Sequence, residues 1–286
     1  PILIPMGRIA LLLGGFLLLA TPAQAGLMDL LDSIESPLQE SPELPPLPDE
    51  PGKGKNWIGT EIPKPDLPIL VLAGHADSQR MAGSGTPGRA VGMRGARPMQ
   101  PGITDELFWN LLTAKAVVAE GQRQGLKMRF YDPGVRTIRD SDDPRTNWSV
   151  GREHVSNGGY AVEIHYDAYS PHGIGPGIIP ALLYGFSVMD EALAEEFGAY
   201  PYDYRGMLGG PRRGLAMLEI GQLEGALEAG LRNPSTRQQS LQTIARRVVR
   251  ALRQGMVLAN SPVEGTTLLK GSITEPVLGP REDVSE

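Results

Sequence analysis

Apolar runs alternate with helical segments along the middle of this chain, and this alternation restricts the fold more than any other feature. Five apolar runs have the length and composition of buried strands. They cover residues 67–72, 126–131, 160–166, 181–185 and 215–220. Helical segments separate most of them. An alternation of this kind predicts an α/β protein whose sheet is covered by helices on both faces.

Four segments carry the apolar spacing or the end signals of helices. They cover residues 104–123, 147–157, 187–200 and the stretch that starts at Ser235. Thr104 is a suitable N-cap, and Asp105 and Glu106 follow in the first turn, where the helix dipole favours carboxylates. The last helix begins with a capping-box pattern and continues with an apolar stripe, which consists of Leu241, Ile244, Val248 and Leu252.

Ionisable side chains follow three of the predicted strands. His75 comes after the first strand, His165 ends the third and Glu219 ends the fifth. Because ligand sites in α/β sheets form at the carboxyl ends of the strands, we expect these side chains to lie close together. Glu106 starts the helix that follows the first strand. Spacing alone leaves each histidine equally open to a structural role.

A histidine, a carboxylate and a second histidine form a ligand set typical of catalytic zinc sites. Zinc bound in this way lowers the pKa of water to about 7, and a further carboxylate can then act as general base and acid. The third of these strand-end residues, Glu219, is placed for that role. The chain has no cysteine, so thiolate ligands, thiol nucleophiles and disulfides are excluded.

The first 25 residues have the layout of a secretory signal peptide. Arg8 supplies a positive charge, residues 9–20 are apolar, and Ala23-Gln24-Ala25 is a small-x-small cleavage site. A retained membrane anchor is the alternative, but the apolar run is short for a span. Residues 26–67 contain a dense series of prolines and are predicted to be a linker. We expect a domain at 68–260 and a flexible polar tail at 261–286.

The net charge of −6 argues against a nucleic-acid or anionic-membrane partner. After removal of the signal peptide, no remaining segment is apolar enough for an integral membrane span. The sequence therefore predicts an exported globular protein.

Four motifs occur in the order found in zinc-dependent N-acetylmuramoyl-L-alanine amidases, the enzymes that cut the sugar–peptide amide of the bacterial cell wall. Residues 69–75 resemble the strand-Gly-His opening of that family, and residues 104–111 resemble its helix with a metal-binding Glu and a following Asn-Leu pair. Residues 152–168 resemble its Arg-x-x-x-Ala-Asn segment and Ser-Ile-His-Ala-Asn-Ala strand. Residues 215–221 resemble the strand that carries the catalytic Glu.

The resemblance implies a three-layer α/β/α sandwich with a mixed, mostly parallel sheet. It also implies zinc on His75, Glu106 and His165, with Glu219 as the acid/base. The implied substrate is peptidoglycan, cut between N-acetylmuramic acid and L-alanine, in the periplasm or outside the cell at the wall. Whether a protein activator is needed stays open.

Departures from the family pattern keep other functions open. Ala76-Asp77 and a long loop replace a Gly-Gly and a short loop, Asp167 replaces an Asn, and Gln222-Leu223-Glu224-Gly225 replaces a Phe-x-Ser-Asn segment. An exported zinc peptidase or deacylase with another substrate is one alternative, and a non-catalytic wall-binding protein is another. Glu106 together with Glu219 argues against the non-catalytic alternative.

Three further residues are candidates for contact with substrate or for support of the metal ligands. Arg152 is expected to pair with a carboxylate and brace the site. Asp167 lies two residues after His165, where a carboxylate could orient a ligand. His172 lies in a Gly/Pro-rich loop near the proposed site, whereas His154 is expected on a solvated helix face.

Overall fold

The computed structural model describes residues 54–260. The predicted signal peptide, most of the predicted linker and the predicted tail lie outside these residues. The elements follow one another as β1 (Ile69–Ala73), α2 (Gly88–Gly92), α3 (Asp105–Arg123), β2 (Met128–Tyr131), α4 (Asn147–Ser156), β3 (Tyr160–Asp167), β4 (Gly177–Ile179), α5 (Val188–Phe197), β5 (Leu215–Gln222), α6 (Gly225–Arg232) and α7 (Pro234–Asn260). Two short 3₁₀ turns, η1 (Tyr204–Gly206) and η2 (Pro211–Arg213), lie between α5 and β5.

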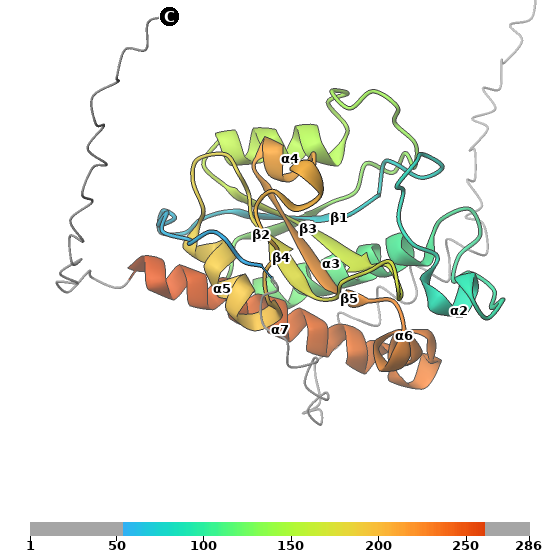
Figure 1. Ribbon diagram of the computed structural model, residues 1–286. Coiled ribbons are helices and arrows are strands. Elements are labelled where there is room, and N and C mark those ends of the chain that lie inside the picture. Colours follow the sequence, from blue (N-terminus) through green and yellow to red (C-terminus); the bar gives the residue numbers. More distant parts are fainter. Residues whose placement is uncertain (1–53, 261–286) are drawn as a thin grey trace, which may run out of the picture.

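The five strands form one sheet in the order β2-β1-β3-β5-β4. The first four of these run parallel to one another, and β4 pairs antiparallel with β5. Helices α3, α5 and α7 cover one face, and α4 covers the other (Figure 1). The structure is therefore a three-layer α/β/α sandwich with a mixed, mostly parallel sheet, as the sequence predicts.

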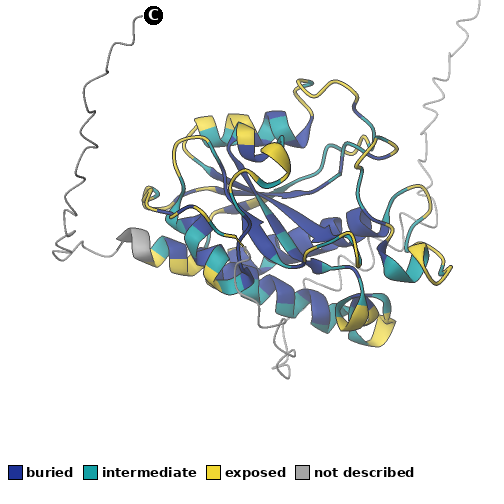
Figure 2. Cartoon of the chain, viewed as in Figure 1, coloured by how far each residue is buried: buried dark blue, intermediate teal, exposed yellow. Residues whose placement is uncertain are grey.

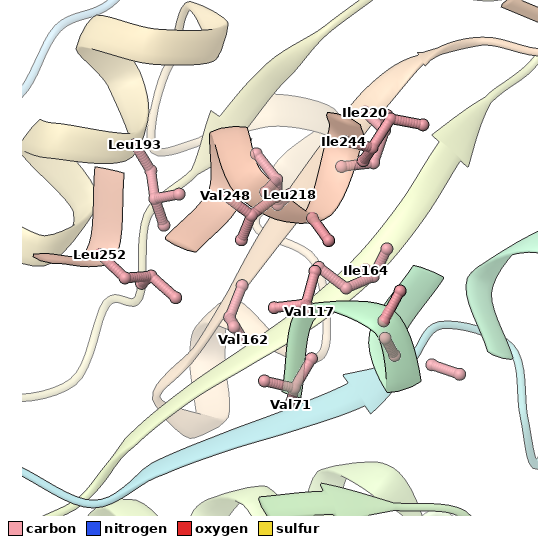
Figure 3. Packing of buried hydrophobic residues seen from close by; sticks show 14 of the residues in the cluster. Val71, Val117, Val162, Ile164, Leu193, Leu218, Ile220, Ile244, Val248 and Leu252 are labelled. Carbon is pink, nitrogen blue, oxygen red and sulfur yellow. The ribbon is translucent and has the colours of Figure 1, made fainter. Parts of the chain in front are cut away.

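The main core lies between the sheet and helices α3, α5 and α7. Every residue of β1 and of β3 is buried, as expected for central parallel strands with both faces covered. Strand and helix side chains interdigitate in this layer (Figure 3). The apolar stripe predicted for the last helix, which includes Val248 and Leu252, is buried in this core. Exposed residues gather on the outer faces of the helices and on the loops (Figure 2).

The fourth strand was predicted in the wrong place. The structure puts β4 at Gly177–Ile179, where it pairs with Met217 to Glu219 of β5. Residues 181–185 form a turn instead, with positive φ angles at Tyr184 and Gly185. Pro180 separates the two segments, and its missing N–H cannot continue a strand ladder. Helices α2 and α6 were not expected from the sequence.

Residues 54–67 pack against the domain, although the sequence places them in the linker. The Trp57 side chain is 4% exposed, and its Nε1–H donates to the carbonyl oxygen of Tyr200 at 2.8 Å. Glu61 forms an isolated parallel bridge with Ser187, the N-cap of α5. The packed part of the chain therefore begins before Leu67. Among the described helices, none combines the length and apolarity that crossing a bilayer requires.

Candidate metal centre

His75 and His165 meet at the carboxyl edge of the sheet. His75 lies two residues after Ala73, the last residue of β1. It has a φ angle of +61°, a left-handed conformation that is costly for a residue with a side chain. The two imidazole rings lie edge to face, with centroids 4.8 Å apart. Gly74 makes this approach possible, because a Cβ on Gly74 would lie 2.2 Å from Cε1 of His165.

Glu106 reaches the two histidines from the first turn of α3. The helix begins as predicted, with the Thr104 side chain accepting from the backbone N–H of Leu107. Oε2 of Glu106 accepts from the backbone N–H of Thr86 at 2.7 Å. Oε1 is left 3.2 Å from Nε2 of His75 and 3.3 Å from Nδ1 of His165. One carboxylate oxygen is therefore fixed by the backbone, and the other faces both imidazoles.

These three side chains form a group that can hold a divalent metal ion. Their ligand atoms all lie within 4.8 Å of one another, and the three come from elements far apart in the sequence. Burial opposes charge on Glu106, but the two histidines outweigh it and lower the pKa of this carboxyl. An ionised carboxylate oxygen and two imidazole nitrogens fit the donor set of a site that leaves a coordination position open.

Glu219 lies beside this group on the neighbouring strand. It pairs with His165 in the register of β3 and β5, so both side chains project from the same face of the sheet. Its Oε2 is buried and has no hydrogen-bond partner among residues 54–260. Burial raises the pKa of Glu219 to about 8, and the negative charges of Glu106 and Asp167 add to this, while His165 opposes it. A carboxyl with a free oxygen and a pKa near neutrality can exchange protons with a bound substrate.

A pocket of about 310 Å³ opens next to both histidines on the α4 side of the sheet. Much of its wall comes from two loops. The loop after β1 contributes residues 81–83, and the segment before β5 contributes residues 208–210. Trp148 of α4 and the buried Glu163 of β3 also line it. A substrate seated in this pocket would lie directly against the histidine pair.

No family model matches the chain, and no curated protein matches it either. Several solved structures do match the chain. N-acetylmuramoyl-L-alanine amidase AmiC2 of Nostoc punctiforme is 13% identical with a TM-score of 0.43, covering 66% of this chain and 96% of that chain. Amidase Ami1 of Mycobacterium smegmatis is 16% identical with a TM-score of 0.43, covering 68% and 100%. The catalytic domain of CwlV, an amidase from Bacillus (Paenibacillus) polymyxa var. colistinus, is 16% identical with a TM-score of 0.44, covering 66% and 97%. In each case the similarity extends over about two thirds of this chain.

Asp167 organises a loop next to the metal-binding group. Its Oδ2 accepts from the backbone N–H groups of Ile174 and Gly175 at 2.6 and 3.0 Å, and its Oδ1 accepts from Ala168. The hydroxyl of Tyr200 also donates to it at 3.4 Å. The Asp167 carboxylate thus holds the backbone of residues 168–175 in place. Its negative charge also raises the pKa of Glu219.

The other sequence candidates lie away from this cluster. Arg152 is exposed on α4, and no hydrogen bond or ion pair joins it to the metal-binding group within the described chain. His172 is exposed on the 168–175 loop. His154 contacts the carbonyl oxygen of Pro68 at 3.0 Å, before the start of β1 and hence at the opposite edge of the sheet.

Sequence reasoning missed three residues that shape the centre. Gly74 gives the close approach of the rings, and Asn147 and Glu163 lie directly behind them. The signal for Glu163 is present in the sequence. It lies two residues before His165 on a buried strand, and a period of two places both on the same face.

Proposed function

We propose that this chain is a zinc-dependent N-acetylmuramoyl-L-alanine amidase, which hydrolyses the amide bond between N-acetylmuramic acid and L-alanine in peptidoglycan. One observation carries the proposal. The ligand atoms of His75, Glu106 and His165 converge within 4.8 Å, and Glu219 lies on the adjacent strand with a buried, unpaired oxygen. The four motifs of the sequence lead to the same residues in the same roles.

The roles of the residues follow from this geometry. A zinc ion held by the two imidazoles and by Oε1 of Glu106 would polarise the amide carbonyl and lower the pKa of water. Glu219, in its ionised form, takes a proton from the attacking water at Oε2. It then donates this proton to the alanine nitrogen as the amide bond breaks. A dication nearby favours the ionised form of Glu219 at the start of this sequence.

The proposal includes export and action at the cell wall, which rests on the signal peptide expected at residues 1–25. The pocket beside the histidines is open to a polymeric substrate because it lies at the loop edge of the sheet. Trp148 lines it, and the guanidinium of Arg213 lies over the Trp148 ring, 4.6 Å from its centroid.

The test measures metal and bond specificity on one preparation of the mature protein. Purified wall sacculi are incubated with the protein, and new N-terminal alanine is quantified beside the zinc content. One zinc per chain and release of N-terminal alanine are the expected results. New N-termini of other residues, or release of acyl groups, would point to a zinc peptidase or deacylase. Binding to sacculi without any cleavage would point to a wall-binding protein and would overturn the proposal.

A further inference from the structure

Glu163 is a buried carboxylate that the proposed chemistry does not use. It lies on β3, with its side chain 4% exposed and on the same face of the sheet as His165. In the resembled family motif, this strand position carries a serine. A buried carboxylate is unfavourable unless a charged or hydrogen-bonding group satisfies it. Its surroundings therefore indicate what it does.

One nitrogen of His165 lacks a partner. Nδ1 lies 3.3 Å from the Glu106 oxygen that also faces His75, whereas Nε2 is buried and makes no hydrogen bond with any residue in the described range. A neutral imidazole carries one proton. If the Nδ1 lone pair is directed at a metal ion, the proton must lie on Nε2. An N–H group buried in this way requires an acceptor.

Glu163 places a carboxylate acceptor close to this nitrogen. Its Oε2 lies 3.9 Å from Nε2 of His165, which is slightly too long for a hydrogen bond, so a small shift of either side chain would form one. Room for this oxygen depends on Gly210, because a Cβ there would lie 2.8 Å from Oε2 of Glu163. Within the described residues, Glu163 accepts a hydrogen bond at Oε1 and none at Oε2, so no other donor competes for Oε2.

Asn147, the first residue of α4, holds the other carboxylate oxygen in place. Its Nδ2 donates to Oε1 of Glu163 at 3.1 Å and to the carbonyl oxygen of Ala73 at 2.7 Å. Its backbone N–H donates to Oδ2 of Asp77 at 2.7 Å. The end of β1, the start of α4 and the Glu163 side chain are thus joined through one buried residue.

We propose that Glu163 is a positioning residue that accepts the Nε2–H of His165 and thereby fixes the tautomer that offers Nδ1 to the metal ion. The inference rests on the proposed function, since it requires a bound metal. Carboxylates behind a metal-ligating histidine orient the ring and raise its basicity, and their loss typically lowers metal affinity about 10–100-fold. Asn147 then orients Glu163.

Zinc affinity, measured by competition with a chromophoric chelator, tests this role without reference to catalysis. Glu163→Ala is expected to weaken zinc binding about 10–100-fold. Glu163→Gln keeps an acceptor oxygen without the charge, so its affinity should lie between those of Glu163→Ala and the wild type. Met217→Ala is the matched control. Met217 pairs with Glu163 in the strand register and lines the same pocket, but it lacks a hydrogen-bonding group for Nε2 of His165, so zinc affinity should be unchanged.

Histidine ¹⁵N NMR of the zinc-loaded wild type gives a second, direct readout. The proposal requires His165 to be protonated at Nε2 and metal-bound at Nδ1. Metal binding through Nε2, or wild-type zinc affinity in a folded Glu163→Ala or Glu163→Gln protein, would overturn it. If the wild type itself binds no zinc, both this inference and the proposed function fail. If the wild type binds zinc and the Glu163 variants bind it equally well, the positioning role alone is wrong.

Discussion

At the residue scale, the buried Oε2 of Glu219 has no hydrogen-bond partner within residues 54–260. Glu219→Gln keeps the shape of the side chain but cannot accept a proton, so we expect hydrolysis to fall by about 10²–10⁴-fold. Zinc content should stay at the wild-type level. Parallel assays of metal content and wall hydrolysis check this. A variant that keeps zinc and hydrolyses at the wild-type rate would show that another group moves the proton.

Gly74 gives a second prediction at this scale, because the His165 ring fills the space that a side chain at residue 74 would need. Gly74→Ala should destabilise the protein by about 1–3 kcal/mol through overpacking and should also weaken zinc binding, since the ring must move. Gly151→Ala is the control. A Cβ on Gly151 would lie 2.3 Å from Cδ2 of Leu215, so it also crowds the interior, but it leaves the rings alone. Chemical denaturation and zinc titration of both variants separate the two effects.

At the element scale, the N-terminus of α3 is tied to α6 through a buried ion pair. The Asp105 side chain is 1% exposed, and it pairs with Arg232 while its Oδ1 accepts from the backbone N–H of Met99. Arg232→Ala leaves this carboxylate without its charged partner, which should cost about 3–5 kcal/mol. Because Glu106 is the next residue, zinc affinity should fall as well.

Arg250 of α7 provides the comparison for that ion pair. Its side chain is 65% exposed and pairs with Glu196. Exposed pairs contribute about 0–1 kcal/mol, so Arg250→Ala should change the unfolding free energy little. Equal losses in the two variants would mean that the Asp105 pair is not the anchor of α3.

Helices and central strands were predictable because their signals are local. The cap at Thr104, the apolar stripe of α7 and the continuous apolar run of β1 each lie within one segment. Strand β4 was misplaced because it has only three residues and depends on antiparallel pairing with β5, which is a tertiary interaction. The neighbouring apolar residues 181–185 gave a stronger local pattern, yet positive φ angles bend the chain there.

At the scale of the whole molecule, Asp190 predicts how stability depends on pH. Burial raises the pKa of this fully buried carboxyl to about 7, against hydrogen bonds from Tyr160 and Ser187 that lower it. Between its ordinary value of 3.8 and about 7, the folded chain holds a proton that the unfolded chain has lost. The contribution of Asp190 to the free energy of unfolding is therefore fully present below pH 4 and is lost as the pH rises to 7.

Urea unfolding of the metal-free protein across this pH range measures the effect. The slope due to Asp190 is at most about 1.4 kcal/mol per pH unit. Asp190→Asn removes the titration, so its stability should fall less steeply than that of the wild type from pH 4 to 7. Parallel curves for the two proteins would contradict the raised pKa.

Removal of metal gives a second prediction for the whole molecule. Zinc at about 100 times its dissociation constant should stabilise the folded state by about 2.7 kcal/mol. For a domain of this size, a chelator should then lower the melting temperature by roughly 5–10 °C. His75→Ala should melt at the same temperature with and without the chelator. A wild type that does not respond would indicate that the cluster holds no ion.

The gathering of His75, His165 and Glu219 at one edge of the sheet was predictable, but the contacts that hold these side chains in place were not. His75, His165 and Glu219 stand at strand ends, and a topological rule brings strand ends together. Arg152 shows the limit of that reasoning, because the sequence does not reveal which side of α4 faces the sheet edge, and the residue lies on the exposed side. Asn147 and Glu163 act through contacts between α4 and β3, which appear only when the layers are packed.

The contacts of Trp57 decide where the chain can be truncated from its N-terminal side. Its indole donates to Tyr200 and packs near Phe186, with ring centroids 5.6 Å apart. Tyr200 begins the stretch of chain that continues to the pocket wall at residues 208–210. A polypeptide shortened to start at Leu67 would leave that carbonyl oxygen without its indole donor and would remove one of the rings that pack beside Phe186. Shortened forms should therefore retain Trp57 if the wall of the pocket is to keep its shape.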